Sequence, residues 1–134
     1  MKEMKYGEGI KSEVLCIGEY RGVGYVIVNI GGSHPCAYVQ SNKNYGDDCD
    51  IPSHCGITFF GSLYRWCDYV DNEEHKEMLR QNFIGWDYAH LSDYVWYCFV
   101  VEEDGSLGKK WSTQEIFDEV KIAIDWIKEV KSKT

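Results

Sequence analysis

Several features that mark common protein classes are missing from this sequence of 134 residues. It has no run of about 18 apolar residues, and its first segment, MKEMKYGEGIKSE, lacks the apolar centre of a secretory signal. We therefore expect a cytoplasmic protein without membrane contact. Basic residues are few, 14 against 22 acidic ones, and the net charge of −8 would repel a nucleic-acid backbone. Direct nucleic-acid binding is not expected, and a protein partner would need a basic surface.

Cysteine pairs of the CxxC type are also missing, although the chain has six cysteines. Zinc fingers normally supply their ligands in such pairs, so no finger is predicted. A cytoplasmic chain keeps its cysteines as thiols, which leaves some of them free to bind a metal. A phosphate-binding loop ending in GKS or GKT is missing too, as is a Ser-His-Asp signature.

The chain does contain ample material for a folded core. Apolar residues make up 44% of it and aromatic residues 15%. Its length falls in the usual range of one domain and leaves little room for a second. We therefore expect a single domain over residues 1–134.

Residues 12–30 predict a β-hairpin, because apolar residues cluster on both sides of EYRG and Gly22 suits a tight turn. Its second half, YVIVNI, is almost continuously apolar, which is typical of a central strand that is buried on both faces. Further strands are predicted at CAYVQ (36–40), ITFFGSLYRW (57–66), FIGWDYA (83–89) and YVWYCFVV (94–101). The sheet should have five or six strands, mostly antiparallel.

Two segments predict helices. DNEEHKEMLRQ (71–81) has an Asp or Asn cap followed by acidic residues, and it is long enough for one or two turns. STQE (112–115) is a capping box, and apolar residues recur behind it at steps of three and four. This pattern predicts a helix from about 113 to 131 that packs on the sheet. Because strands and helices do not alternate regularly, the expected fold class is α+β.

Side chains suited to chemistry gather in FIGWDYAHLSDY, residues 83–94. On a helical turn Asp87, His90 and Asp93 would share one face, whereas in an extended segment only the two aspartates would. Imidazole and carboxylate at this spacing can bind one metal ion. His34 and His54 lie at strand ends or in loops, where a sheet could bring them to the same place.

We therefore predict a zinc site. Its predicted ligands are His34, His54, Asp87 and His90, and possible additional ligands are Asp93, Cys36, Cys49 and Cys55. The alternative is that each histidine forms local hydrogen bonds and only orders a loop.

The same residues suit an enzyme, although no catalytic residue can be assigned from the sequence. A metal-bound water, or a histidine base oriented by Asp87 or Asp93, would support hydrolysis of an ester or phosphoester. A second version uses Cys55 as a nucleophile beside His54. Tyrosines and tryptophans crowd the middle of the chain, and they are typical both of a core and of protein-binding surfaces.

Three motifs resemble a family of small accessory proteins encoded by phages, prophages and mobile elements of Gram-positive bacteria. They are SHPCAYV (33–39), HCGITF (54–59) and IGWDYAHLSDY (84–94), and the resemblance spans about residues 21–128. The family pattern reads roughly His-Pro-x-Ala-Tyr-Val, His-Gly-Gly-Leu-Thr-Tyr and Gly-Phe-Asp-x-Ala-His-x-x-Asp. The predicted histidines and aspartates match it, whereas Cys36 and Cys55 stand where it has other residues. The resemblance therefore favours the histidine and aspartate set over the thiols.

The resemblance also implies a role inside a host cell. Small acidic phage proteins often antagonise host defence, and some anti-CRISPR proteins that act on Cas9 are of this size. By analogy, the leading expectation is a zinc-containing inhibitor that binds a basic host protein. A small metal-dependent hydrolase of esters or phosphoesters is the second.

Overall fold

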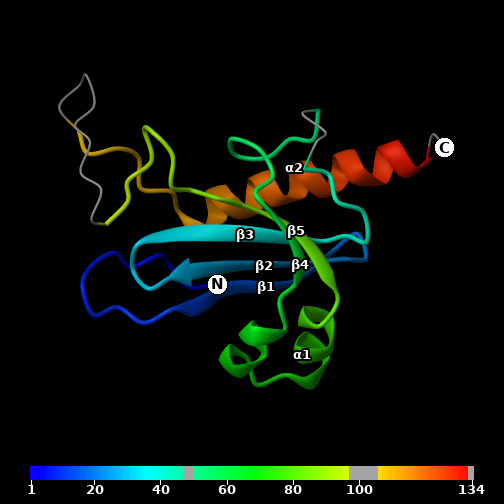
Figure 1. The fold of residues 1–134 in the computed structure, drawn as a ribbon, viewed down its shortest axis with the longest axis horizontal. Coiled ribbons are helices and arrows are strands. Elements are labelled where there is room, and N and C mark those ends of the chain that lie inside the picture. The colour runs from blue at the N-terminus through cyan, green and yellow to red at the C-terminus, as the bar shows by residue number, and fades with distance from the viewer. Residues whose placement is uncertain (47–49, 97–105, 133–134) are drawn as a thin grey trace.

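The computed structural model describes residues 1–46, 50–96 and 106–132, with side chains up to residue 130. Five strands form one antiparallel sheet in the order β1-β2-β3-β5-β4, and a long helix packs on it (Figure 1). The elements in chain order are β1 (Glu13–Tyr20), β2 (Val23–Ile30), β3 (His34–Gln40), β4 (Phe59–Ser62), the 3₁₀ helix η1 (Tyr64–Tyr69), α1 (Glu73–Leu79), β5 (Asn82–Asp87) and α2 (Thr113–Ser132). The predicted α+β class, with a C-terminal helix, is confirmed.

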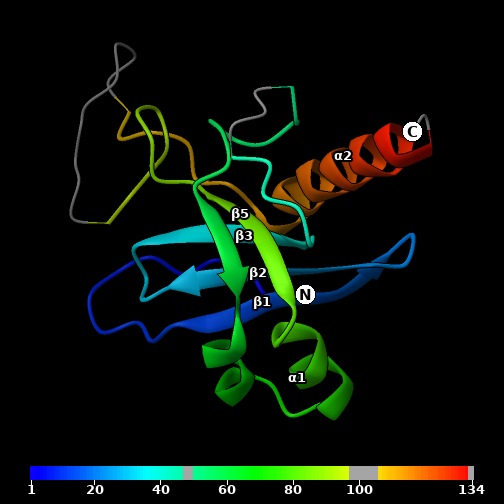
Figure 2. The ribbon, with the colours of Figure 1, turned by 45° about the vertical axis from the view of Figure 1, so that its right-hand side comes forward.

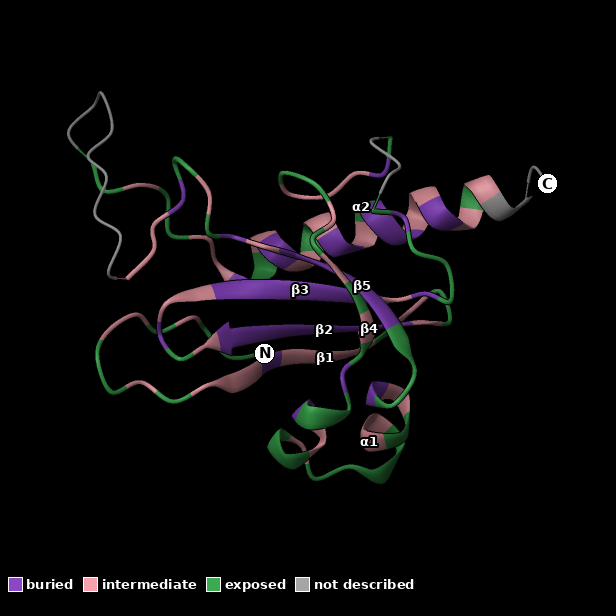
Figure 3. Ribbon diagram, viewed as in Figure 1, coloured by how far each residue is buried: buried purple, intermediate pink, exposed green. Residues whose placement is uncertain are grey.

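The predicted hairpin is the pair β1 and β2. Its turn places Arg21 at φ 53° and Gly22 at φ 78°, so two successive residues take the left-handed conformation that a tight hairpin turn requires. Six of the eight residues of β2 are buried, and the strand lies between β1 and β3. It is therefore a central strand that is covered on both faces, as its apolar run predicts (Figure 3).

Successive residues of the strands point to opposite faces of the sheet and separate the core into two layers. Ile27, Ala37 and Trp86 pack with α2 on one face. Val28, Tyr38 and Phe83 pack with residues of η1 and α1 on the other face. Figure 2 shows α2 on one side of the sheet and α1 on the other.

The helix α2 begins as its sequence predicts. The Glu115 N–H donates to Ser112 Oγ at 3.1 Å, and the Ser112 N–H donates to Glu115 Oε1 at 2.9 Å, so both halves of the capping box are formed. The apolar stripe of α2 supplies Ile116, Val120 and Ile124 to the core, each with no exposed surface.

The segment after the loop departs from its predicted form. A strand was expected over residues 57–66, but β4 ends at Ser62 and the chain turns into η1. The turn buries Leu63 and Trp66 under the sheet, which an edge strand at those positions would not do. The predicted helix at 71–81 forms as α1, and the Asn72 side chain accepts a hydrogen bond from the His75 N–H at 3.0 Å.

The strand expected over residues 94–101 falls mostly outside the described residues. Of its residues, 94–96 are described, and they belong to no strand element. Asp93, just before them, forms an isolated parallel bridge with Lys109. No helix within the described ranges combines the length and the apolar character that crossing a membrane requires.

Candidate metal centre

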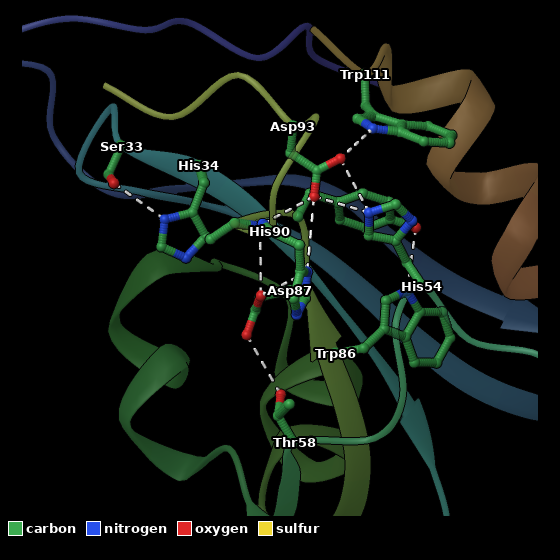
Figure 4. Close-up of polar contacts among 11 residues, drawn as sticks. Ser33, His34, His54, Thr58, Trp86, Asp87, His90, Asp93 and Trp111 are labelled. Carbon is green, nitrogen blue, oxygen red and sulfur yellow. Dashed lines mark hydrogen bonds and ion pairs between the residues drawn. The ribbon is translucent and has the colours of Figure 1, made fainter. Parts of the chain in front are cut away.

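The predicted site residues converge at one end of the sheet. His34 is the first residue of β3, Asp87 is the last of β5, and these two strands are direct neighbours. His54 comes from the loop before β4, and His90 and Asp93 come from the turn after β5 (Figure 4). The Asp93 N–H donates to the His90 carbonyl at 2.9 Å, which closes this turn. The motif DYAHLSD is therefore a strand end followed by a turn, neither wholly helical nor wholly extended.

The Asp93 carboxylate is contacted by several groups of the site. Its side chain is 4% exposed, and a buried carboxylate requires hydrogen-bond donors. The His90 N–H donates to Oδ2 at 3.0 Å, and the Trp111 Nε1–H donates to Oδ1 at 2.9 Å. The His54 Nε2 lies 2.8 Å from Oδ2 and 3.0 Å from Oδ1. Since the carboxylate can only accept, these contacts place the His54 proton on Nε2 and leave Nδ1 with a free lone pair.

His90 faces the carboxylates of Asp87 and Asp93 with its Nδ1 atom. This nitrogen lies 3.5 Å from Asp87 Oδ1 and 3.6 Å from Asp93 Oδ2, and it is buried without a short hydrogen bond. The carboxylates favour a proton on Nδ1, which leaves the free lone pair of the His90 ring on Nε2. Asp87 is itself held by the Ala89 N–H at 3.3 Å and the Thr58 hydroxyl at 3.4 Å.

Cys55 completes a group of possible metal donors. One nitrogen of His54, one nitrogen of His90 and the sulfur of Cys55 all lie within 4.8 Å of one another. Two ligands of one tetrahedral zinc ion, each 2.0–2.3 Å from the metal, lie about 3.3–3.8 Å apart, so binding one ion would draw the three donor atoms closer together. The three residues can therefore hold a metal ion. The Cys55 side chain is exposed, so the group opens to solvent.

The backbone at Cys55 takes an unusual conformation. Its φ of 60° lies in the left-handed region, which costs a residue with a side chain about 1 kcal/mol or more. The Cys55 thiol is also destabilised as an anion: partial desolvation, together with the charges of Asp93 and Asp87, raises its pKa. A nucleophilic cysteine normally needs a lowered pKa, and this thiol has the opposite.

His34 lies at the margin of the group and does not contribute to the three donors. Its Nδ1 is 3.0 Å from the Ser33 hydroxyl, and its ring is within the electrostatic influence of Asp87 and His90. Burial is the largest influence on this ring and lowers its pKa, so His34 is neutral at pH 7. A neutral imidazole next to the donors can accept a proton.

The remaining predicted ligands take other positions. Cys36 is buried in the core directly across from Asp87 in the β3 and β5 pair, and burial raises its thiol pKa to about 12. Cys49 lies outside the described residues. Asp87 and Asp93 contact the imidazoles, which is the position of groups that orient metal ligands.

Aromatic rings form the floor of the site, and the sequence did not predict their role. The His54 ring stacks on Tyr88 with centroids 4.4 Å apart and planes at 17°. The Tyr88 hydroxyl accepts from the Trp86 Nε1–H at 3.0 Å and donates to Glu119 of α2 at 2.6 Å. Burial raises the pKa of Tyr88, so its hydroxyl keeps the proton that it donates. The floor therefore fixes the plane of the His54 ring.

Gly108 secures the other side of Asp93. The Lys109 N–H donates to the Ser92 carbonyl at 2.7 Å, and the Tyr94 N–H donates to the Lys109 carbonyl at 2.8 Å. Gly108 has φ 100°, and a Cβ atom there would lie 2.7 Å from the carbonyl carbon and oxygen of Asp93. Only glycine fits such a close approach.

Comparison with models of known protein families found no match, and comparisons with curated proteins and with solved structures found none either. The case for a function therefore depends on the geometry of the site.

Proposed function

We propose that this protein is a hydrolase that uses one zinc ion, bound by His54, Cys55 and His90, to cleave an ester or phosphoester. The observation that carries the proposal is the approach of the three donor atoms to within 4.8 Å of one another. Imidazole nitrogen and thiolate sulfur are the donors that zinc prefers.

The carboxylates behind the imidazoles support a metal site. A histidine that binds a metal through one ring nitrogen usually donates the N–H of the other to a carboxylate, a backbone carbonyl or a water, which fixes the tautomer and makes the ligand more basic. Asp93 does this for His54 at 2.8 Å, and Asp87 and Asp93 face the Nδ1 atom of His90. The free lone pairs of both rings are then the ones available to a cation.

The number of donors supports catalysis over a purely structural role. Structural zinc sites are closed by four protein ligands, whereas catalytic sites use three and keep one position for water. Within residues 1–46, 50–96 and 106–132 the group has three donors, and Cys55 is exposed to solvent. Bound zinc would lower the pKa of a water molecule to about 7. His34, whose pKa is lowered by burial, is neutral at pH 7 and so has a lone pair that can accept a proton at the margin of the site.

The charge around Cys55 favours a metal ligand over a free nucleophile. Desolvation, together with the charges of Asp93 and Asp87, raises the pKa of the thiol, so the uncomplexed residue stays protonated at pH 7. A divalent cation would reverse this effect and hold the sulfur as thiolate.

The decisive experiment measures metal content and turnover together. Purified protein is expected to bind one equivalent of zinc, and the zinc-loaded form should hydrolyse 4-nitrophenyl acetate faster than protein treated with a chelator. The His90→Ala variant should lose both zinc and turnover. His75→Ala is the matched control, because His75 lies on α1 and takes no part in the donor group.

Thermal unfolding of the same variants separates catalysis from a structural role. His90→Ala is expected to lose turnover with little loss of melting temperature, because an open site contributes less to folding than a closed one. A folded protein that binds no zinc, or turnover that persists without metal, would contradict the proposal.

The interpretation as an inhibitor of a host defence protein stays a prediction. It is supported by the resemblance of the three motifs and by the net charge of −8. A stoichiometric complex with Cas9 that weakens with salt, formed equally well by His90→Ala, would favour it over the hydrolase.

A further inference from the structure

A cavity of about 420 Å³ lies under the sheet beside η1, within the size range of small-ligand sites. Its walls include Arg65, Trp66 and Tyr69 of η1 together with Ile30 at the end of β2. The Trp66 and Tyr69 rings pack with centroids 4.7 Å apart and form an aromatic wall. No function described above uses this cavity.

The cavity lies next to the candidate metal centre. Ile30, in its wall, is the direct cross-strand partner of His34, and two positions further along β3 Cys36 is paired with Asp87. One molecule that extends past His34 could therefore contact both the cavity and the candidate metal centre.

Arg65 is the cationic group of the cavity, and it has no carboxylate partner among the described residues. The other two arginines are both paired, Arg21 with Asp125 at 2.7 Å and Arg80 with Glu77 at 3.1 Å. An unpaired arginine is notable in a chain with a net charge of −8. Asp68 lines the same cavity, and its carboxylate would repel an anion. A bound anion must therefore lie on the side of the cavity that Arg65 lines.

We propose that the cavity binds a negatively charged group of the substrate, a carboxylate or a phosphate, and that Arg65 selects for it. This inference rests on the proposed hydrolase activity at His54, Cys55 and His90. The guanidinium forms paired hydrogen bonds with either anion, and the aromatic wall contacts the neighbouring carbon atoms. The favoured substrate is then an ester that carries an anion at some distance from the bond that is cleaved.

The test compares two esters with the zinc-loaded full chain: 4-nitrophenyl acetate, which is neutral, and mono-4-nitrophenyl succinate, whose longer acyl chain ends in a carboxylate. Arg65→Gln should lower kcat/KM for the succinate ester about 10- to 100-fold and leave the acetate ester unchanged. Arg80→Gln is the matched control, because it removes an exposed arginine away from the cavity. Asp68→Asn should raise kcat/KM for the succinate ester. Equal losses for both esters, or no loss for either, would overturn the subsite.

A binding measurement tests the subsite even if neither ester is cleaved. Succinate and inorganic phosphate are titrated separately into metal-free protein while the indole N–H signal of Trp66 is followed by NMR. A shift with either anion that Arg65→Gln abolishes supports the subsite and identifies the anion that it binds. Absence of a shift with both anions overturns the subsite, whereas absence of turnover alone overturns the hydrolase.

Discussion

The two faces of the sheet are covered in different ways. On the α2 face, fifteen of the described residues form one buried cluster, whereas the face under η1 and α1 has eight. The second face also has exposed rings, Tyr64 at 70% and Tyr69 at 50%, and it holds the cavity beside Arg65. The difference suggests that the α2 face supplies most of the hydrophobic stabilisation.

The candidate centre lies where these two regions meet, at the end of the sheet. Trp111 and Glu119 reach it from the α2 side, and His34 leads from it to the cavity on the other side. Stable packing on one face thus holds polar groups in position at the edge, while the thinly covered face leaves room for a ligand.

The largest expected effect comes from removing apolar volume under α2. Ile124→Ala should lower the free energy of unfolding by about 2–5 kcal/mol, because Ile124 has no exposed surface and its loss leaves a cavity. Ile122→Ala is the control on the same helix, since Ile122 is 55% exposed and should change the free energy by less than about 0.5 kcal/mol. Denaturant titration measures both. Similar values for the two variants would show that α2 does not carry this share of the stability.

A smaller loss is expected at the edge where the two regions meet. Asp93→Asn should lower the free energy of unfolding by about 1–3 kcal/mol. The amide cannot accept the hydrogen bonds from His54, Trp111 and the His90 backbone as the carboxylate does. Zinc affinity should fall about 10- to 100-fold with the loss of this orienting group. Calorimetric unfolding and zinc titration test the two parts. Asp71→Asn, an exposed position before α1, should change neither.

The smallest effect is a pH dependence at the margin between centre and cavity. Burial lowers the pKa of His34 below its ordinary value of 6.5, so the unfolded chain takes up a proton that the folded chain resists. His34 therefore does not lower the free energy of unfolding at pH 7.5, but it lowers this free energy increasingly as the pH falls through 6.5. The His34→Asn variant should lose less melting temperature than the parent between pH 7.5 and 5.5. An equal loss of melting temperature in both proteins would show that a group other than His34 causes the pH dependence.

Local patterns predicted the elements well, because their causes lie within a few residues. The capping box at Ser112 and Glu115, the Asn72 cap and the turn at Gly22 all form as the sequence indicates. The strand predicted to extend to residue 66 stops early, because burial of Leu63 and Trp66 under the sheet outweighs their preference for a strand.

The candidate site was only partly predictable. The residue types of His54, Asp87, His90 and Asp93 predict a site, and the fold does bring these side chains together. The roles of Trp111 and Tyr88 were not foreseen, since Trp111 bonds Asp93 across 18 positions and Tyr88 bonds Glu119 across 31. No local pattern encodes such contacts. The family pattern ranked Cys55 below the other residues, yet its sulfur lies among the donors.

Gly108 imposes a restriction that reaches beyond its own position. A single methyl group there would press on the Asp93 backbone, and the displacement would pass through that carboxylate to His54. Position 108 should consequently tolerate replacement as poorly as the donor residues, although glycine has no functional group to lose. A survey of tolerated substitutions would rank this residue with those of the candidate metal centre for purely steric reasons.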